Sequence, residues 1–143
     1  MSVVVFSLKS HHAKRVYCGS KRAEFRRATV RAAPGDLALV YETRPVGLVT
    51  GFFVIEGVVV VSAQSLHQFE DDDLERRCIE RYLNGAKRPV ALLIGQPRRF
   101  RRPFDLHRLG IERPPQSYQF LQRSYTHPFL HEAKEPIWGI LPS

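Results

Sequence analysis

The sequence predicts an α+β fold, a small mixed β-barrel of about six strands with two or three short helices. Short apolar runs bounded by Gly and Pro turn signals recur along the chain, and they do not alternate regularly with helices as in a doubly wound sheet. Two segments have the apolar spacing of amphipathic helices. Gly51 and Gly57 interrupt the longest strand-like stretch, and glycines inside a strand are typical of bulges where a sheet curves.

The predicted strands are apolar runs whose limits are set mostly by turn residues. Pro34-Gly35-Asp36 precedes one strand, and Pro45-Val46-Gly47 follows it. Gln96-Pro97 is expected to interrupt the fifth strand, after which residues 98–102 continue as an exposed strand or hairpin arm. The strands are predicted at residues 3–7, 23–27, 37–43, 48–61, 90–94 and 117–121.

The predicted helices follow from apolar residues spaced by three and four. Ser10 is the expected N-cap of the first helix, and Gly19 is expected to end it in a left-handed conformation. The acidic run at residues 70–75 indicates the start of the second helix, where negative charge complements the macrodipole. One face of this second helix is predicted to carry Leu74, Cys78, Ile79 and Tyr82. The helical segments are residues 10–18, 72–83 and, as a single turn, 105–109.

The chain has 143 residues, the length of one domain. Residues 1–121 are expected to form this domain, and residues 122–143 an irregular C-terminal tail packed on it. The chain contains no apolar stretch of membrane-spanning length and no secretory signal, which predicts a cytoplasmic protein without membrane association. Cys18 and Cys78 are too few for a disulfide scaffold or a cysteine-built zinc site.

A formal charge of +8 predicts a polyanionic partner, because Lys and Arg that neutralise phosphates release condensed counterions. The charge is unevenly distributed. Residues 9–31 hold eight basic residues and one acid, and residues 98–113 hold six arginines and two acids. The acids gather instead at residues 70–75. The sequence therefore predicts a polarised surface with nucleic acid as its partner.

The segment Gly19-Ser20-Lys21-Arg22-Ala23-Glu24-Phe25-Arg26 has the pattern G-x-K-x-x-E-x-R. It resembles the signature of the ASCH family, named for activating signal cointegrator homology and similar in fold to PUA domains. Residues 41–56 resemble the central hairpin of the family, and residues 104–118 resemble its closing part. The resemblance spans residues 3–121 and leaves the C-terminal tail without a counterpart.

The resemblance implies a cleft beside the motif that binds RNA, single-stranded nucleic acid or a modified nucleoside. Some members resemble small amidohydrolases or have been proposed as ribonucleases, which gives an alternative function. This alternative is a metal-independent hydrolase that acts on RNA or on N4-acylated cytidine. No metal or other cofactor is expected, and the protein is expected to be a monomer or a weak dimer. Because one fold serves many functions, the reaction must be argued from the residues.

Lys21, Glu24 and Arg26 form the centre of the predicted site. On a strand, positions 24 and 26 share a face, and Lys21 lies in the preceding loop. Glu24 either orients the two cations as phosphate clamps or accepts a proton from a water molecule. The candidate catalytic residues are Lys21, Glu24 and, on a later strand, Glu56. The candidate nucleic-acid-binding residues are Ser7, Lys9, Lys21, Arg22, Arg26, Arg27, Tyr41, Thr43, Arg99, Arg101, Gln116 and Ser117.

Simpler interpretations stand beside these hypotheses. The motif residues could form only a structural ion-pair network, and the arginines of residues 98–102 could only deter edge-to-edge strand pairing. Tyr41 and Tyr118 could stack on bases or belong to the core. The pairs His11-His12 and His127 with His131 have poor spacing for a helical metal site, so no metal ligands are predicted.

Overall fold

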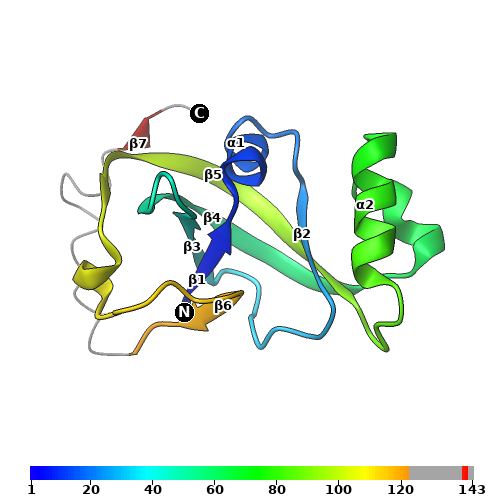
Figure 1. The fold of residues 1–143 in the computed structure, drawn as a ribbon. Helices are drawn as coiled ribbons and strands as arrows, with labels where there is room; N and C mark the ends of the chain where they lie inside the picture. The colour runs from blue at the N-terminus through cyan, green and yellow to red at the C-terminus, as the bar shows by residue number, and fades with distance from the viewer. Residues whose placement is uncertain (123–139, 142–143) are drawn as a thin grey trace.

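The computed structural model describes residues 1–122 and, for residues 140–141, the path of the backbone. Figure 1 shows a curved sheet with α2 beside β2 at one end and the segment that contains η2 at the other. The elements are β1 (Val3–Leu8), α1 (Ser10–Tyr17), β2 (Ala23–Arg26), β3 (Leu37–Glu42), β4 (Leu48–Val60), the 3₁₀ helix η1 (Ala63–Gln68), α2 (Asp73–Leu83), β5 (Val90–Phe104), the 3₁₀ helix η2 (Leu106–Leu109), β6 (Tyr118–Phe120) and β7 (Ile140–Leu141).

Six strands form a half-barrel in the order β2, β5, β4, β3, β1, β6, and β7 pairs with β5 outside this path. β1 and β3 are parallel, and the other strand pairs are antiparallel. This mixed sheet confirms the predicted PUA-like α+β fold. β2 and β6 are the two edges of the path, so the groups near these strands lie where the half-barrel opens.

The core lies on both faces of the sheet because β1 is apolar at nearly every position. Val3 and Val5 contribute to one cluster, which also contains Phe100 and Phe104 of β5. Val4 and Phe6 point to the opposite face and pack with α1. Alternate side chains of a strand face opposite ways, so a continuous apolar run is what a strand covered on both sides requires. A third cluster joins β2 and β5 to η1 and α2.

The long strands β4 and β5 curve through several register shifts, and Gly51 lies at one of them. A Cβ atom at Gly51 would lie 2.2 Å from the carbonyl oxygen of Arg98 and 2.6 Å from the hydroxyl of Tyr17, so only glycine fits there. The predicted interruption at Gln96-Pro97 is wrong, because β5 continues to Phe104. Gln96 has a φ of +48°, and a register shift of β4 against β5 accommodates Pro97, which has no N–H to donate.

α1 begins and ends close to the predicted residues. Lys9, rather than Ser10, occupies the N-cap and makes no side-chain capping bond, so the predicted Ser10 cap is wrong. The predicted end is confirmed, because Gly19 follows the helix with a φ of +86° and donates its N–H to the carbonyl of Val16. The Lys21 N–H then donates to the carbonyl of Arg15 at 3.0 Å. The loop therefore turns tightly and brings Lys21 back beside α1.

α2 begins as predicted but uses a different face. Asp72 is its N-cap and accepts a hydrogen bond from the N–H of Glu75 at 2.9 Å. Of the face predicted to be apolar, Leu74 is 70% exposed and Tyr82 is 47% exposed. Ile79 and Leu83 are the buried residues. α2 covers only one end of the sheet, so one narrow stripe suffices to pack it and the remaining apolar side chains face outward.

Two parts of the chain complete the description. η1 was not predicted, and it is held by the reciprocal capping of Ser62 and Ser65. Of the predicted irregular tail, Ile140 and Leu141 pair with Phe100 and Arg99 of β5, and residues 123–139 and 142–143 lie outside the described residues. No helix in the described part of the chain is long and apolar enough to cross a membrane.

Candidate nucleic-acid site

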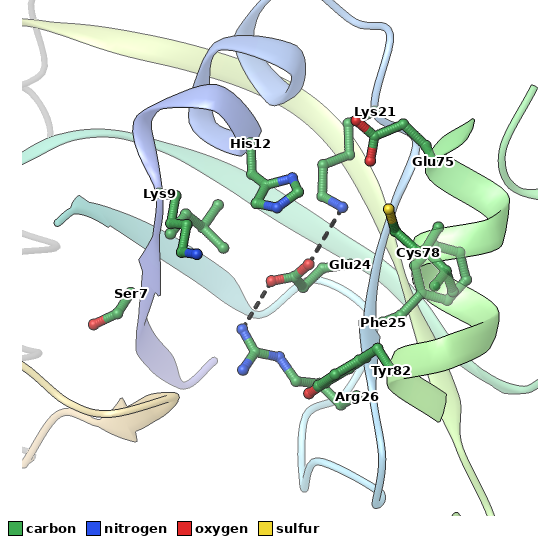
Figure 2. Close-up of a pocket in the computed structure, with 12 residues that line it drawn as sticks. Ser7, Lys9, His12, Lys21, Glu24, Phe25, Arg26, Glu75, Cys78 and Tyr82 are labelled. Carbon is green, nitrogen blue, oxygen red and sulfur yellow. Dashed lines mark hydrogen bonds and ion pairs between the residues drawn. The ribbon is translucent and has the colours of Figure 1, made fainter. Parts of the chain in front are cut away.

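A hollow of about 380 Å³ lies at the β2 edge of the sheet, between β1 and α1 on one side and α2 on the other. Figure 2 shows that β2 runs through the middle of this region, so its side chains alternate between the two walls. We call this hollow the β2 pocket. Its lining residues are Ser7, Leu8, Lys9, His12, Lys21, Glu24, Phe25, Arg26, Glu75, Cys78, Ile79 and Tyr82.

The three motif residues meet in this pocket as a buried ion-pair cluster. The Lys21 ammonium lies 3.4 Å from one oxygen of Glu24, and the Arg26 guanidinium lies 2.8 Å from the other. Lys21 is only 5% exposed and Glu24 only 8%. Burial alone would raise the pKa of the Glu24 carboxyl, but the charges of Lys21 and Arg26 outweigh it, so this pKa lies below its usual value. Glu24 is therefore a carboxylate at neutral pH.

Arg26 also connects the two edges of the half-barrel. Its guanidinium donates to the Ser117 hydroxyl just before β6 and lies over the Phe6 ring at 5.0 Å from the centroid. The carbonyl of Ser117 accepts from the N–H of Ser7 at 3.0 Å, and the Ser7 hydroxyl donates to the carbonyl of Pro115 at 2.5 Å. Ser7 and Ser117, both predicted as site residues, are thus held beside the motif cations.

His12 is a pocket residue that was not predicted as part of the nucleic-acid site. Figure 2 shows its ring directed from α1 towards Lys21 and Glu24. Its Nδ1 atom is buried and has no hydrogen-bond partner among the described residues. Burial, together with the charge of Lys21, lowers the pKa of His12, so the imidazole is neutral at physiological pH. The sequence could have indicated His12 by its position, because it is the third residue of the helix that follows the strand with Ser7.

Several predicted site residues lie away from the β2 pocket. Glu56 is exposed, and its carboxylate lies across Gly95 instead of facing the motif. Tyr41 is buried in the core. Arg99 stacks on the Tyr17 ring at 4.3 Å. The others outside the pocket lining are Arg22, Arg27, Thr43, Arg101, Gln116 and Ser117, of which Ser117 contacts Arg26.

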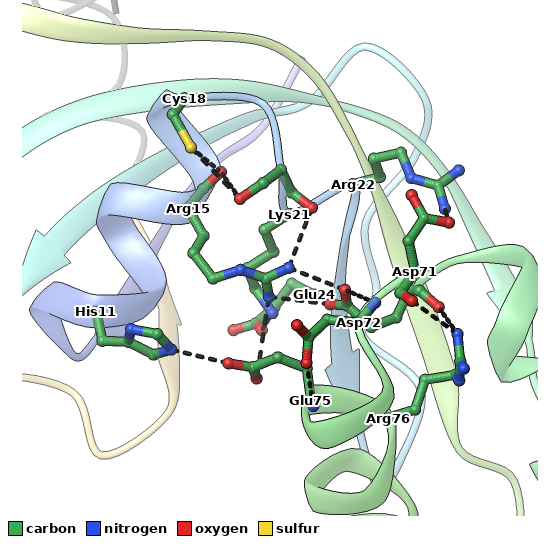
Figure 3. A network of polar contacts seen from close by, with 12 residues as sticks. His11, Arg15, Cys18, Lys21, Arg22, Glu24, Asp71, Asp72, Glu75 and Arg76 are labelled. Carbon is green, nitrogen blue, oxygen red and sulfur yellow. Dashed lines mark hydrogen bonds and ion pairs between the residues drawn. The ribbon is translucent and has the colours of Figure 1, made fainter.

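The acidic run between η1 and α2 occupies part of the basic surface, as Figure 3 shows. Glu70 is 2% exposed, and its two carboxylate oxygens accept hydrogen bonds from Nη1 and Nη2 of Arg15 at 2.9 and 2.8 Å. Arg22, predicted to bind nucleic acid, lies 3.0 Å from Asp71. These contacts fasten α1 and the motif loop to the start of α2, and they neutralise the cations on that side of the molecule.

One group in the described part of the chain has the composition of a metal site. The ligand atoms of His11, His12 and Glu75 lie within 4.8 Å of one another. Histidine and carboxylate ligands suit zinc and related cations. The Glu75 carboxylate is already 2.8 Å from the His11 ring and 3.9 Å from Arg15, and these contacts account for its position without a cation. The expectation of a site without metal therefore stays a prediction.

Comparison with known proteins agrees with the motif. The sequence profile described as "ASCH domain" matches residues 6–114. A relative from Zymomonas mobilis called "ASCH domain-containing ribonuclease" is 30% identical over 128 residues, which cover 85% of this chain and 86% of the relative. The crystal structure of ASCH from the same organism superposes with a TM-score of 0.71 at 27% identity and covers 90% of this chain and 94% of that chain.

A second crystal structure from Z. mobilis, of a variant of ZmASCH with tyrosine changed to phenylalanine, superposes with a TM-score of 0.73 at 25% identity. It covers 92% of this chain and 98% of that chain. The likeness therefore extends over nearly the whole length of both proteins, in sequence and in fold. With the G-x-K-x-x-E-x-R segment folded into one ion-pair cluster at the sheet edge, these matches place the chain in the ASCH domain family.

Proposed function

We propose that this protein binds single-stranded RNA in the β2 pocket, with a phosphate held by Lys21 and Arg26. The observation that carries the proposal is the buried Glu24 carboxylate, which bonds to both cations and holds them in one place. Cations that are fixed before binding lose little conformational entropy when a phosphate arrives. Lys9 adds a third, exposed positive charge at the pocket wall. The relative from Z. mobilis, named a ribonuclease, supports RNA as the partner.

Fluorescence anisotropy with a labelled single-stranded RNA tests binding, and Lys9 and Arg101 offer a matched pair of variants. Both side chains are exposed, but only Lys9 lines the pocket. Lys9→Ala is expected to lower affinity several-fold and to reduce the slope of log K against log salt by about 0.7, the value for one phosphate contact on a single strand. Arg101→Ala is expected to change both less. RNA binding that is absent, or independent of salt, contradicts the proposal.

A second candidate function is RNA cleavage in the same pocket, and the neutral His12 favours it. An imidazole with a lowered pKa is a free base at neutral pH, whereas the Glu24 carboxylate is too strongly stabilised by its two cations to be an effective one. In this reaction His12 removes the proton of a ribose 2′-hydroxyl, whose oxygen attacks the adjacent phosphorus. Lys21 and Arg26 stabilise the charge that develops on the phosphoryl oxygens.

The bond to the 5′-oxygen then breaks and leaves a 2′,3′-cyclic phosphate. The 5′-oxygen takes a proton from a water molecule, and His12 returns its own proton to the solvent, so the step is balanced without a metal ion. Glu24 acts here as a positioning residue for the two cations. Glu56, which lies away from the pocket, has no role in this scheme.

Cleavage is tested with a single-stranded RNA and with the same oligonucleotide carrying 2′-deoxyribose throughout. The expected result is a 2′,3′-cyclic phosphate product from RNA and no cleavage of the deoxy analogue. His12→Ala should abolish cleavage while RNA binding persists, because the phosphate clamp is intact. An N4-acylated cytidine assayed in parallel tests the amidohydrolase alternative. Its turnover, without cleavage of RNA, would replace the ribonuclease proposal.

A further inference from the structure

A second hollow, of about 490 Å³, is lined by residues 27–29, which directly follow β2 and the pocket residue Arg26. Its charged lining residues are Arg27, Lys87 and Arg88, and Val60 and Val90 supply apolar walls. None of the described carboxylates lines it. We call it the Arg27 pocket. The surface near Arg15 and Arg22 is different, because acidic residues neutralise it.

The Arg27 guanidinium is held by neutral backbone carbonyls, and these do not neutralise its charge. Its Nη1 atom donates to the carbonyls of Tyr82 and Asn84, at 2.5 and 3.0 Å. These are exposed carbonyls at the C-terminal end of α2, where the helix dipole favours a cation. Lys87 and Arg88 lie on the loop that follows α2, and both are exposed. In the part of the chain that the structure describes, none of these three cations forms an ion pair with a carboxylate.

Tyr82 connects the two pockets. Its side chain lines the β2 pocket and is 47% exposed, and its own carbonyl accepts from Arg27. Figure 2 shows the Tyr82 side chain beside Arg26. Arg26, the last residue of β2, lines the β2 pocket, and Arg27, the next residue in the chain, lines the Arg27 pocket. The exposed Tyr82 ring thus lies beside the cations of the first pocket, and its carbonyl holds a cation of the second. Single-strand-binding proteins combine aromatic rings for base stacking with cations for backbone contact in the same way.

We infer that the RNA strand extends from the β2 pocket across Tyr82 into the Arg27 pocket. One base stacks on the Tyr82 ring, and phosphates beyond it bind Arg27, Lys87 and Arg88. This inference rests on the proposed function, and it adds the direction of the strand and a requirement for length. An RNA that fills only the β2 pocket does not reach Lys87 and Arg88, whereas a longer one does.

The inference predicts a length-dependent effect of remote substitutions. Affinities of wild type, Tyr82→Ala and the double variant Lys87→Ala/Arg88→Ala are compared for single-stranded RNAs of about 3 and about 12 nucleotides. The double variant should lose at least fivefold in affinity for the long RNA and less than twofold for the short one, whereas Tyr82→Ala, which removes a ring that lines the β2 pocket itself, should weaken the binding of both. For the double variant, the slope against log salt should fall by about 1.4 with the long RNA, the value for two phosphate contacts.

The double variant Arg101→Ala/Arg102→Ala is the matched control, since it also removes two exposed arginine or lysine charges, but from β5 outside both pockets. Losses in Lys87→Ala/Arg88→Ala that equal those in the control, or that are equal for short and long RNA, overturn the inference and leave the proposed function standing, and so does a Tyr82→Ala protein that binds the long RNA as tightly as wild type. Wild type that binds neither RNA overturns the proposed function itself. Equal binding of double-stranded DNA overturns the single-strand path, because paired bases cannot stack on Tyr82.

Discussion

Replacing Glu24 by glutamine should destabilise the fold more than any other single change of charge in the β2 pocket. Glutamine keeps the shape of the side chain but leaves Lys21 and Arg26 without the carboxylate that lies 3.4 and 2.8 Å from them. All three side chains are at most 11% exposed, so water cannot compensate. Removing one partner of a buried ion pair costs about 3–5 kcal/mol. We expect about 3 kcal/mol, because Arg26 keeps its contact with Ser117.

Urea unfolding at several pH values measures this effect. The pKa of Glu24 is lowered in the folded state, so its contribution is fully present above the unfolded value of about 4.3 and is lost as the pH falls through the lower folded value. The difference between wild type and Glu24→Gln should therefore be greatest at neutral pH, where a loss of about 3 kcal/mol lowers Tm by roughly 10 °C. It should shrink below about pH 4.

Glu56→Gln is the control, because this carboxylate is exposed and lies outside the pocket. It should change stability by less than about 0.5 kcal/mol. A Glu24→Gln protein as stable as wild type at pH 7 would refute the reasoning that Glu24 is an ionised and structurally required partner of the two cations. A loss that is the same at pH 3 and pH 7 would refute the electrostatic cause and point to packing.

Three further predictions concern the backbone, the base and metal dependence. Gly51→Ala should lower the free energy of unfolding, measured in urea, by more than about 3 kcal/mol, because the added Cβ atom would meet a backbone carbonyl. Gly95→Ala should lower it by less than about 1 kcal/mol, because the nearest atoms belong to the flexible side chain of Glu56. If RNA is cleaved, the acid limb of the profile of kcat/KM against pH should lie below about 6.5, because the pKa of His12 is lowered; a midpoint above that value excludes His12. Cleavage should persist in EDTA. If EDTA abolishes cleavage, and zinc or manganese restores it in wild type but not in His11→Ala, a metal ion bound by His11, His12 and Glu75 is required instead.

The fold was largely predictable because local signals agree with the tertiary structure at most positions. The apolar run of β1 and the turn before β3 determine where strands lie, and Gly19 ends α1 as expected. The failures occur where tertiary contacts override such signals. Pro97 was expected to break a strand, but its missing donor falls at a register shift between β4 and β5, so the strand continues. No spacing rule reveals such a shift in advance.

The candidate site was predicted where residues are close in sequence and missed where the fold brings them together. Lys21, Glu24 and Arg26 lie on one short loop and strand, so their convergence follows from period-two geometry. Glu56 was assigned by residue type alone, and β4 directs it away from the pocket. His12 and Tyr82 reach the pocket from two helices on opposite sides of β2, and their positions depend on helix packing. The apolar stripe of α2 is narrower than its sequence indicates, which leaves Tyr82 exposed.

A net charge of +8 indicates a polyanionic partner, but the placement of the acids determines where it can bind. Acids of the run from Glu70 to Glu75 pair with Arg15, Arg22 and Arg76, so the charges of these arginines are neutralised within the protein. In the β2 pocket Glu24 is shared by two cations and Glu75 pairs with His11 and Arg15, whereas no described carboxylate lines the Arg27 pocket. Positive charge without an acidic partner therefore increases from the motif loop towards Arg27 and the loop after α2. A nucleic acid that follows this gradient must leave the pocket past Tyr82, and this is why the effect of removing Lys87 and Arg88 should depend on RNA length.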